Sequence, residues 1–279
     1  MIYICIPALN EAHTVGVVLW KVRQVMTEFG RDFHLLVLDD GSTDETREVL
    51  EPYARVLPLT VLRNESTGGY AAAVERLLRE VAELSTHPKR DAVVVLQGDF
   101  TESPGDIPAL IRKIEGGADV VGTTVASTDT ELPRATRWAR RGLPWLLSGR
   151  AIPPEIRDPL SSFRAYRVAV VKRALAERAG KPLLGRSGWA ASVELLLAVA
   201  PHARRSEAAE VALRYTRRER PTRFEPWNTV KEVWHLARTA PRRPPAPPAP
   251  DKAVLKPPAP PAGTVPAAGR EPAARATPE

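Results

Sequence analysis

The stretch Ala92-Val-Val-Val-Leu-Gln-Gly-Asp99-Phe-Thr-Glu-Ser-Pro104 decides the predicted fold. Its apolar residues 93–96 follow one another without polar alternation, which is typical of a strand buried on both faces of a parallel sheet. Gly98 allows the backbone to turn, so we expect Asp99 just beyond the carboxyl end of this strand. Ligands of open α/β sheets bind at that edge. The sequence therefore indicates a functional carboxylate at Asp99.

Short apolar runs at residues 2–6, 35–38, 60–62 and 118–121 predict further strands. Segments with apolar residues at helical spacing separate them. Strands that alternate with helices over short connections predict parallel βαβ units, whose carboxyl ends meet at one edge of a sheet. The polar, acidic and Gly-rich loops that follow most of these strands are therefore expected to converge. A last strand is expected at residues 211–215.

Composition separates a folded part from a tail. Thirteen of the 28 prolines lie from residue 240 onward, without a periodic apolar pattern, so residues 239–279 are predicted to be a disordered Pro/Ala-rich tail. An amphipathic helix is expected just before it, at residues 226–238. Its Trp-bearing face suits packing on its own domain or lying on a membrane surface, and both alternatives stay open.

Several bulk properties bear on the compartment. The single cysteine, Cys5, excludes an internal disulfide and fits a reducing environment. Met1 is followed directly by strand sequence, so no signal peptide is expected, and no apolar run approaches the roughly 20 residues of a membrane span. We therefore expect a cytoplasmic protein, with peripheral association at the inner face of the cell membrane as the alternative that the Trp-bearing helix keeps open.

Charge is distributed unevenly along the chain. Residues 1–133 carry 12 Lys/Arg and 21 Asp/Glu, a net charge of −9, whereas residues 134–223 carry 20 and 7, a net charge of +13. Acidic loops suit a divalent cation, and a basic half suits phosphates or an anionic membrane surface. A merely solvated basic surface would have the same composition.

A series of motifs appears in a fixed order along the chain. They are Ile6-Pro-Ala-Leu-Asn-Glu11, Leu38-Asp-Asp-Gly-Ser-Thr-Asp44, Arg63-Asn64 with Gly68-Gly69, Gln97-Gly-Asp99, and Asp158 with Ser161-Ser-Phe-Arg-Ala-Tyr166. Over residues 1–225 this series resembles the family-2 glycosyltransferases of the GT-A fold, and within them the dolichyl- and polyprenyl-phosphate sugar synthases.

The resemblance implies an α/β, Rossmann-like and mostly parallel central sheet flanked by helices. Residues 1–130 would form a nucleotide-sugar half and residues 131–225 an acceptor half. The implied activity is a single-displacement, inverting transfer of a hexose from a UDP- or GDP-sugar.

The resemblance also implies a set of residues that bind the nucleotide sugar: Pro7, Asn10, Glu11, Asp39, Asp40, Asn64, Gly69 and Gln97. Asp39, at a strand end, can accept a hydrogen bond from a base N–H. For Asp40 two roles are open, supporting the ribose or bracing its loop.

Asp99 is the expected catalytic metal ligand, because Mg²⁺ or Mn²⁺ bound by a carboxylate neutralises a diphosphate leaving group. The family strand usually ends in Asp-x-Asp, and here the first position is Gln97. An amide can bond a sugar or ribose hydroxyl but adds no charge, so weaker metal binding is one consequence. The alternative for Asp99 is a cap of the turn.

The acceptor side is expected in the basic half. A lipid phosphate is already ionised at neutral pH and needs cations rather than a base; Arg offers bidentate contacts to it. The expected ligands are Arg137, Arg140, Arg164 and Arg218. Asp158 is the expected second catalytic residue, a base if the acceptor is a hydroxyl, with capping of the following turn as its alternative.

Several functions fit these residues to different degrees. Transfer to a polyprenyl phosphate is favoured, with a soluble hydroxyl acceptor as the alternative and a non-catalytic nucleotide-sugar-binding relative as a third. A nucleotidyltransferase would carry a Gly-rich loop after the first strand, and residues 7–11 do not form one. No nucleic-acid partner is expected, since no recognised binding motif accompanies the basic charge.

Overall fold

The computed structural model describes residues 1–125, 142, 145–147, 149–211 and 226–242, all within a compact unit, Met1–Arg243. The second unit, Pro244–Glu279, lies outside the described residues, and so does most of the tail for which disorder is expected. The expected strand at 211–215 falls mostly outside them too.

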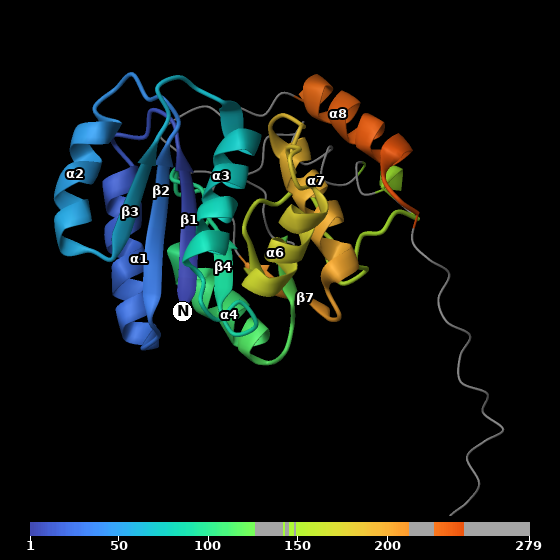
Figure 1. Ribbon diagram of the computed structural model, residues 1–279, viewed down its shortest axis with the longest axis horizontal. Coiled ribbons are helices and arrows are strands. Elements are labelled where there is room, and N and C mark those ends of the chain that lie inside the picture. The colour runs from blue at the N-terminus through green and yellow to red at the C-terminus, as the bar shows by residue number, and fades with distance from the viewer. Residues whose placement is uncertain (126–141, 143–144, 148, 212–225, 243–279) are drawn as a thin grey trace, which may run out of the picture. The chain divides into compact units, whose positions relative to one another are not determined.

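Strands and helices alternate in the first part as predicted (Figure 1). They are β1 (Ile2–Ala8), α1 (Val15–Phe29), β2 (Phe33–Asp39), α2 (Thr46–Val56), β3 (Leu59–Arg63), α3 (Gly69–Leu84), β4 (Ala92–Val95), the 3₁₀ turn η1 (Pro104–Asp106), α4 (Ile107–Glu115) and β5 (Val120–Val125). The second part contains β6 (Arg164–Arg167), α6 (Val168–Glu177), α7 (Trp189–Val199), η2 (Ala200–His202), β7 (Ser206–Val211) and α8 (Pro226–Thr239).

Strand β7 begins five residues before the last strand that the sequence predicts. Its sequence, Ser206 to Val211, holds two glutamates and two alanines, and it forms the edge of the sheet beside β5. An edge strand needs few large apolar residues because one side stays exposed. The apolar signal that sequence reasoning relies on is therefore weak here.

The described strands form one seven-stranded sheet in the order β3-β2-β1-β4-β6-β5-β7. All neighbours pair in parallel except β6, which runs antiparallel between β4 and β5. In this register Val95, the last residue of β4, lies opposite Arg164, the first residue of β6. The segment that leads into β6 is thereby delivered to the edge where β4 ends.

Helices cover both faces of the sheet. The side chains of Ile4 and Ile6 pack on the face with α1, α2 and α4, and those of Tyr3 and Cys5 pack on the face with α3, α6 and α7. Burial on both faces explains why the strands read as continuous apolar runs. Cys5 is fully buried, and burial raises the pKa of its thiol, which confirms that it packs as a small apolar side chain.

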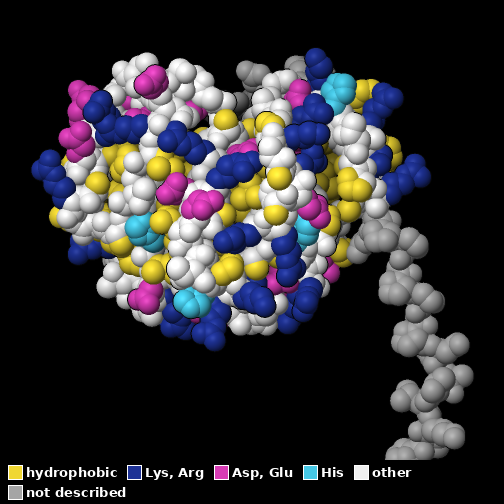
Figure 2. All heavy atoms as spheres, viewed as in Figure 1, with side chains coloured by type: hydrophobic (Ala, Val, Ile, Leu, Met, Phe, Trp, Pro, Cys, Tyr) yellow, Lys and Arg dark blue, Asp and Glu magenta, His cyan; other side chains and the backbone are white. Residues whose placement is uncertain are grey.

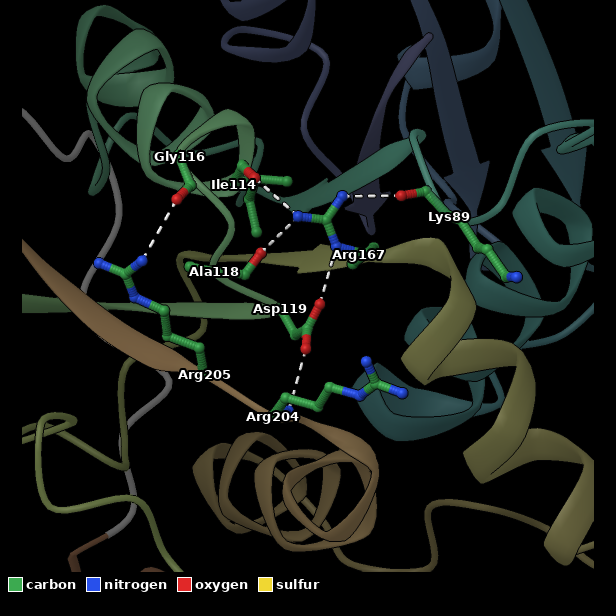
Figure 3. A network of polar contacts seen from close by, with 8 residues as sticks. All are labelled: Lys89, Ile114, Gly116, Ala118, Asp119, Arg167, Arg204 and Arg205. Atoms are coloured by element: carbon green, nitrogen blue, oxygen red, sulfur yellow. Dashed lines mark hydrogen bonds and ion pairs between the residues drawn. The ribbon is translucent and has the colours of Figure 1, made fainter.

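A network around Arg167 fixes the other end of β6 (Figure 3). Its guanidinium bonds Asp119 at 2.8 Å and three backbone carbonyl oxygens, those of Lys89, Ile114 and Ala118. The second oxygen of Asp119 accepts the backbone N–H of Arg204 at 2.9 Å. These bonds connect β6 to α4, to the start of β5 and to the residues just before β7. They cross-link the sheet at the end opposite to the one where β4 ends.

The predicted C-terminal helix is confirmed as α8. Val233, Leu236 and Ala237 pack against α7 and Leu147. The ordered chain continues past it, because Ala240 is buried and the carbonyl of Pro241 accepts the N–H of Ala151 at 3.1 Å. Ala240 and Pro241, which the proline content assigns to the tail, therefore contact residues of the compact unit. Among the described helices, none has the length and apolar character needed to cross a membrane.

Candidate active site

The carboxyl ends of the first parallel strands meet at one edge, as the sequence predicts. Ala8 of β1 lies opposite Asp39 of β2, which lies opposite Arg63 of β3. The loop after β4 reaches the same place: a Cβ added at Gly98 would stand 3.8 Å from Glu11 Cγ and 3.9 Å from the Pro7 carbonyl oxygen. The motif residues are thus brought together from four strands.

Asp39 and Asn10 order the loops after β2 and β1. Asp39 is 5% exposed, and its Oδ1 accepts the N–H of Ser42 at 3.0 Å. Asn10 has a left-handed φ of 55°, a conformation that asparagine tolerates better than most residues. Its N–H donates to Ser42 Oγ at 2.8 Å and its Oδ1 accepts the N–H of Thr43 at 2.7 Å. Asn10 therefore joins the two loops, and contact with the nucleotide sugar remains a prediction.

Asp40 holds the loop between β3 and α3. Its carboxylate accepts hydrogen bonds of 2.6–2.9 Å from four groups of that loop, the side chains of Asn64 and Thr67 and the N–H groups of Gly68 and Gly69. Of its two open roles, this geometry supports bracing. Gly41 permits the close approach, since a Cβ there would lie 2.8 Å from the Thr67 nitrogen.

Glu11 sits where the chain enters α1. Its N–H donates to Thr46 Oγ1 at 2.8 Å, and its Oε2 accepts from Thr14 Oγ1 at 2.7 Å. The first bond fixes the backbone of Glu11 to the first turn of α2, and the second joins its side chain to the residue before α1. Pro7, in β1, is half-buried beside it.

The loop after β4 is bonded to the segment before β6. Asp99 Oδ1 accepts the N–H of Thr101 at 3.0 Å, and Phe100 between them has a φ of 60°. The amide nitrogen of Gln97 donates to Ser162 Oγ at 2.7 Å, and Ser162 donates to Glu102 at 2.7 Å. The prediction that Gln97 touches the sugar is untested, but its amide nitrogen already has a protein partner.

Glu102 and Ser162 are the residues that sequence reasoning missed. Both are buried, with 3% and 7% of their surface exposed. The phenol of Tyr70 lies in the same environment, where burial and then the charge of Glu102 raise its pKa and keep it protonated. Burying a glutamate costs free energy unless its carboxylate is hydrogen-bonded, so buried Glu102 needs these partners. The polar sequence around residue 102 gives no sign of this burial.

Arg164, expected to bind the acceptor phosphate, is turned to the protein interior, and its role as a phosphate ligand stays a prediction. Arg164 is fully buried, and its guanidinium donates to backbone carbonyl oxygens, those of Ser192 at 2.6 Å, Asp158 at 3.1 Å and Pro159. Sequence reasoning placed an arginine among phosphates because the segment is basic. The strand register turns it inward instead, where it organises residues 158–164.

Asp158 is 8% exposed, and its Oδ1 accepts the N–H of Leu160 at 3.2 Å. This bond is the turn cap that stood as the alternative, and a role as base remains a prediction. The other expected phosphate ligands, Arg137, Arg140 and Arg218, lie outside the described residues.

The donor set for a metal is small. No three His, Cys, Asp or Glu side chains gather into a metal site within the described ranges. Mg²⁺ commonly binds through one or two carboxylates together with substrate phosphates. Asp99 at the strand end fits that mode, whereas the side chain of Gln97 is turned toward Ser162.

Comparison with known proteins agrees with this geometry. The family model of glycosyl transferase family 2 matches residues 3–175. Undecaprenyl-phosphate 4-deoxy-4-formamido-L-arabinose transferases from Edwardsiella ictaluri and Pseudomonas aeruginosa (strain LESB58) are each 29% identical, over 62% and 64% of this chain and 50% of theirs. The chain thus spans about half the length of these curated relatives.

A solved structure of glucosyl-3-phosphoglycerate synthase from Mycobacterium tuberculosis, in complex with Mn²⁺ and UDP-glucose, shares the fold. The TM-score is 0.57 at 21% identity, over 85% of this chain and 78% of that one. The fold likeness and the family match, which covers more than half of the residues, lead to one conclusion: this chain belongs to glycosyl transferase family 2.

Proposed function

We propose that this protein transfers a hexose from a UDP- or GDP-sugar to a polyprenyl phosphate. One observation carries the proposal: antiparallel β6 brings residues 158–164 to the sheet edge where Asp39 ends β2 and where the loop with Asp99 follows β4. Donor and acceptor elements therefore share one edge. Relatives that bear the name of undecaprenyl-phosphate sugar transferases support the lipid acceptor.

In this proposal the nucleotide rests on the loops after β1, β2 and β3. Asp39 accepts a hydrogen bond from the base, and Asp40 keeps residues 64–69 in place through four bonds. Asp99 holds Mg²⁺ or Mn²⁺, which when bound stabilises the charge of the departing nucleoside diphosphate.

The acceptor phosphate is itself the nucleophile. One of its oxygens forms a bond to the anomeric carbon while the bond from that carbon to the diphosphate oxygen breaks, so the configuration inverts. No proton has to be removed, and Asp158 then acts only as a cap of its turn, as its bond to Leu160 supports.

Peripheral membrane association is part of the proposal. Trp145 is 79% exposed and Trp234 of α8 is 43% exposed, with the Arg238 guanidinium 4.7 Å from the Trp234 ring centroid. Exposed aromatics beside cations suit a headgroup interface. Figure 2 shows Lys and Arg interleaved with Asp and Glu on the viewed face, rather than a continuous basic footprint of the kind that binds nucleic acid.

The direct test incubates the full chain with labelled UDP- or GDP-sugars, Mn²⁺ and polyprenyl phosphate, followed by organic extraction. Labelled lipid that depends on both Mn²⁺ and acceptor is expected. Absence of labelled lipid with every common donor would overturn the lipid acceptor.

A soluble hydroxyl acceptor is the second candidate, favoured by the carboxylate of Asp158 in the acceptor segment, which could then serve as base. Flotation with anionic vesicles separates the two, because our proposal expects the protein to float with the lipid. Release of a labelled soluble glycoside, lost in Asp158→Asn, would favour the second candidate.

A further inference from the structure

Glu102 closes the loop that carries Asp99. The N–H of Gln97 donates to Glu102 Oε2 at 2.8 Å. This bond joins the first and the last residue of the loop 97–102. Asp99 lies between them, with its own bond to Thr101. The position of Asp99 at the sheet edge therefore depends on a buried side chain three residues further along.

The same carboxylate reaches the acceptor segment. Glu102 Oε1 accepts from Ser162 Oγ at 2.7 Å, and Ser162 Oγ accepts from Gln97 Nε2 at 2.7 Å. A serine hydroxyl has one hydrogen to donate. Since that hydrogen is directed to Glu102, the side chain at position 97 has to supply a donor, which an amide does and a carboxylate does not.

We propose that Glu102, Ser162 and Gln97 are positioning residues that hold the Asp99 loop against residues 158–164. The carboxylate that cross-links the two segments is Glu102, and the amide at position 97 supplies the donor that Ser162 needs. This inference rests on the proposed function and assigns these three residues no contact with substrate.

The competing explanation treats Gln97 as a lost metal ligand. It predicts that Gln97→Glu, which has the same length, tightens Mn²⁺-dependent UDP binding. The closed ring of hydrogen bonds among Gln97, Ser162 and Glu102 predicts instead that Gln97→Glu weakens Mn²⁺-dependent UDP binding. A second carboxylate would face Ser162, whose one hydrogen cannot serve both, and like charges would stand on either side of the hydroxyl.

An exchange of the two groups gives the sharpest test. Gln97→Glu combined with Glu102→Gln keeps the number of atoms and the net charge, and reverses the direction of the two hydrogen bonds to Ser162. We expect each single variant, and Ser162→Ala, to lower kcat at saturating donor by about tenfold and the exchange variant to recover to within about threefold of the wild type, since supporting residues of metal sites typically contribute 10- to 100-fold.

Three measurements accompany kcat: the Kd of UDP with Mn²⁺ by calorimetry, the KM of the donor and the Tm. Ser85→Ala is the matched control, because its buried hydroxyl donates to Asp91 Oδ2 at 2.6 Å, outside the ring. We expect the control to stay within about twofold of wild-type kcat and UDP affinity, as a change that leaves the supporting ring intact.

Tighter Mn²⁺-dependent UDP binding by Gln97→Glu alone would overturn the inference. Recovery of Tm without recovery of kcat in the exchange variant would overturn it as well, since the ring would then serve stability alone. A wild type that neither binds a nucleoside diphosphate with Mn²⁺ nor forms lipid-linked sugar would instead remove the proposed function. If the wild type is active but the kcat of the exchange variant stays low, only this inference is overturned and the proposed function stands.

Discussion

The two parts of the candidate site are built in different ways. The part proposed to bind the nucleotide is the nucleotide part: there Asp40 bonds residues 64–69, and its partners follow it within 29 positions of the chain. The part proposed to carry out sugar transfer, residues 97–102 and 158–164, is the transfer part: there Glu102 and Gln97 bond Ser162, which lies 60 and 65 positions away. The first part is assembled by neighbouring βα loops, and the second by the reversal of β6. Donor binding and transfer should therefore be separable by mutation.

Asp99→Asn, a change in the transfer part, should have the largest effect. The change removes the charge proposed to hold the metal and keeps the size of the side chain. We expect sugar transfer to fall by more than about a hundredfold, beyond the usual effect of a merely supporting residue. Radiolabelled lipid formation measures the loss.

The control for this variant is stability. Asp99 is half-buried and its Oδ1 accepts from Thr101, a bond that the asparagine oxygen can retain. The Tm should therefore stay close to that of the wild type. Transfer at near wild-type rate would contradict the metal assignment.

Arg164→Met should have the next largest effect, on folding. The substitution leaves the carbonyl oxygens that Arg164 bonds without their donor in a fully buried place. We expect a loss of about 3 kcal/mol in the free energy of unfolding, measured by urea denaturation. Arg173→Met, at an exposed position of α6, is the matched control and should change stability little. Wild-type stability together with a raised acceptor KM would support Arg164 as a phosphate ligand.

Arg164 also shows where sequence reasoning stops. The parallel strands and the strand-end carboxylates were predictable, because a buried strand leaves a continuous apolar run and its end leaves Gly and Asp. An antiparallel strand of four residues leaves no such pattern. Whether Arg164 points inward depends on its pairing with Val95, a contact between residues 69 positions apart. Glu102 was missed for the same reason, since its partner is distant in sequence.

Asp40→Asn should weaken the nucleotide part and spare the transfer part. An asparagine offers one acceptor oxygen where the carboxylate offers two, so some of the N–H groups of residues 64–69 lose their partner. We expect about 2 kcal/mol less stability and weaker UDP binding, measured by urea denaturation and calorimetry. Glu45→Gln, an exposed neighbour, is the control. A fall in kcat at saturating donor with unchanged UDP affinity would break the proposed separation.

Glu75→Gln should have the smallest effect. It tests a carboxylate that joins helix α3 to the segment between α6 and α7. Glu75 of α3 accepts the N–H groups of Leu183 and Leu184 at 2.8 and 2.9 Å. Burial raises the pKa of Glu75, but these two bonds and Arg79 outweigh it and hold the pKa below its ordinary value of 4.5. The stabilisation from ionised Glu75 is therefore complete above that value and is lost as the pH falls through the lowered pKa.

At neutral pH we expect Glu75→Gln to be less stable than the wild type by about 1 kcal/mol. Because the variant has no carboxyl group to protonate there, its stability should fall less than that of the wild type between about pH 6 and about pH 3. Urea denaturation across that range measures the difference, and two parallel curves would contradict the role of Glu75. Glu75 shares one feature with each part of the site. It binds backbone N–H groups, as Asp40 does, but its partners lie 108 and 109 positions away in the chain, as distant partners do in the transfer part. Suppose that Glu75→Gln lowers stability without changing UDP affinity or kcat. A carboxylate then belongs to the transfer part because it contacts the Asp99 loop, and a long sequence separation from its partners is not enough.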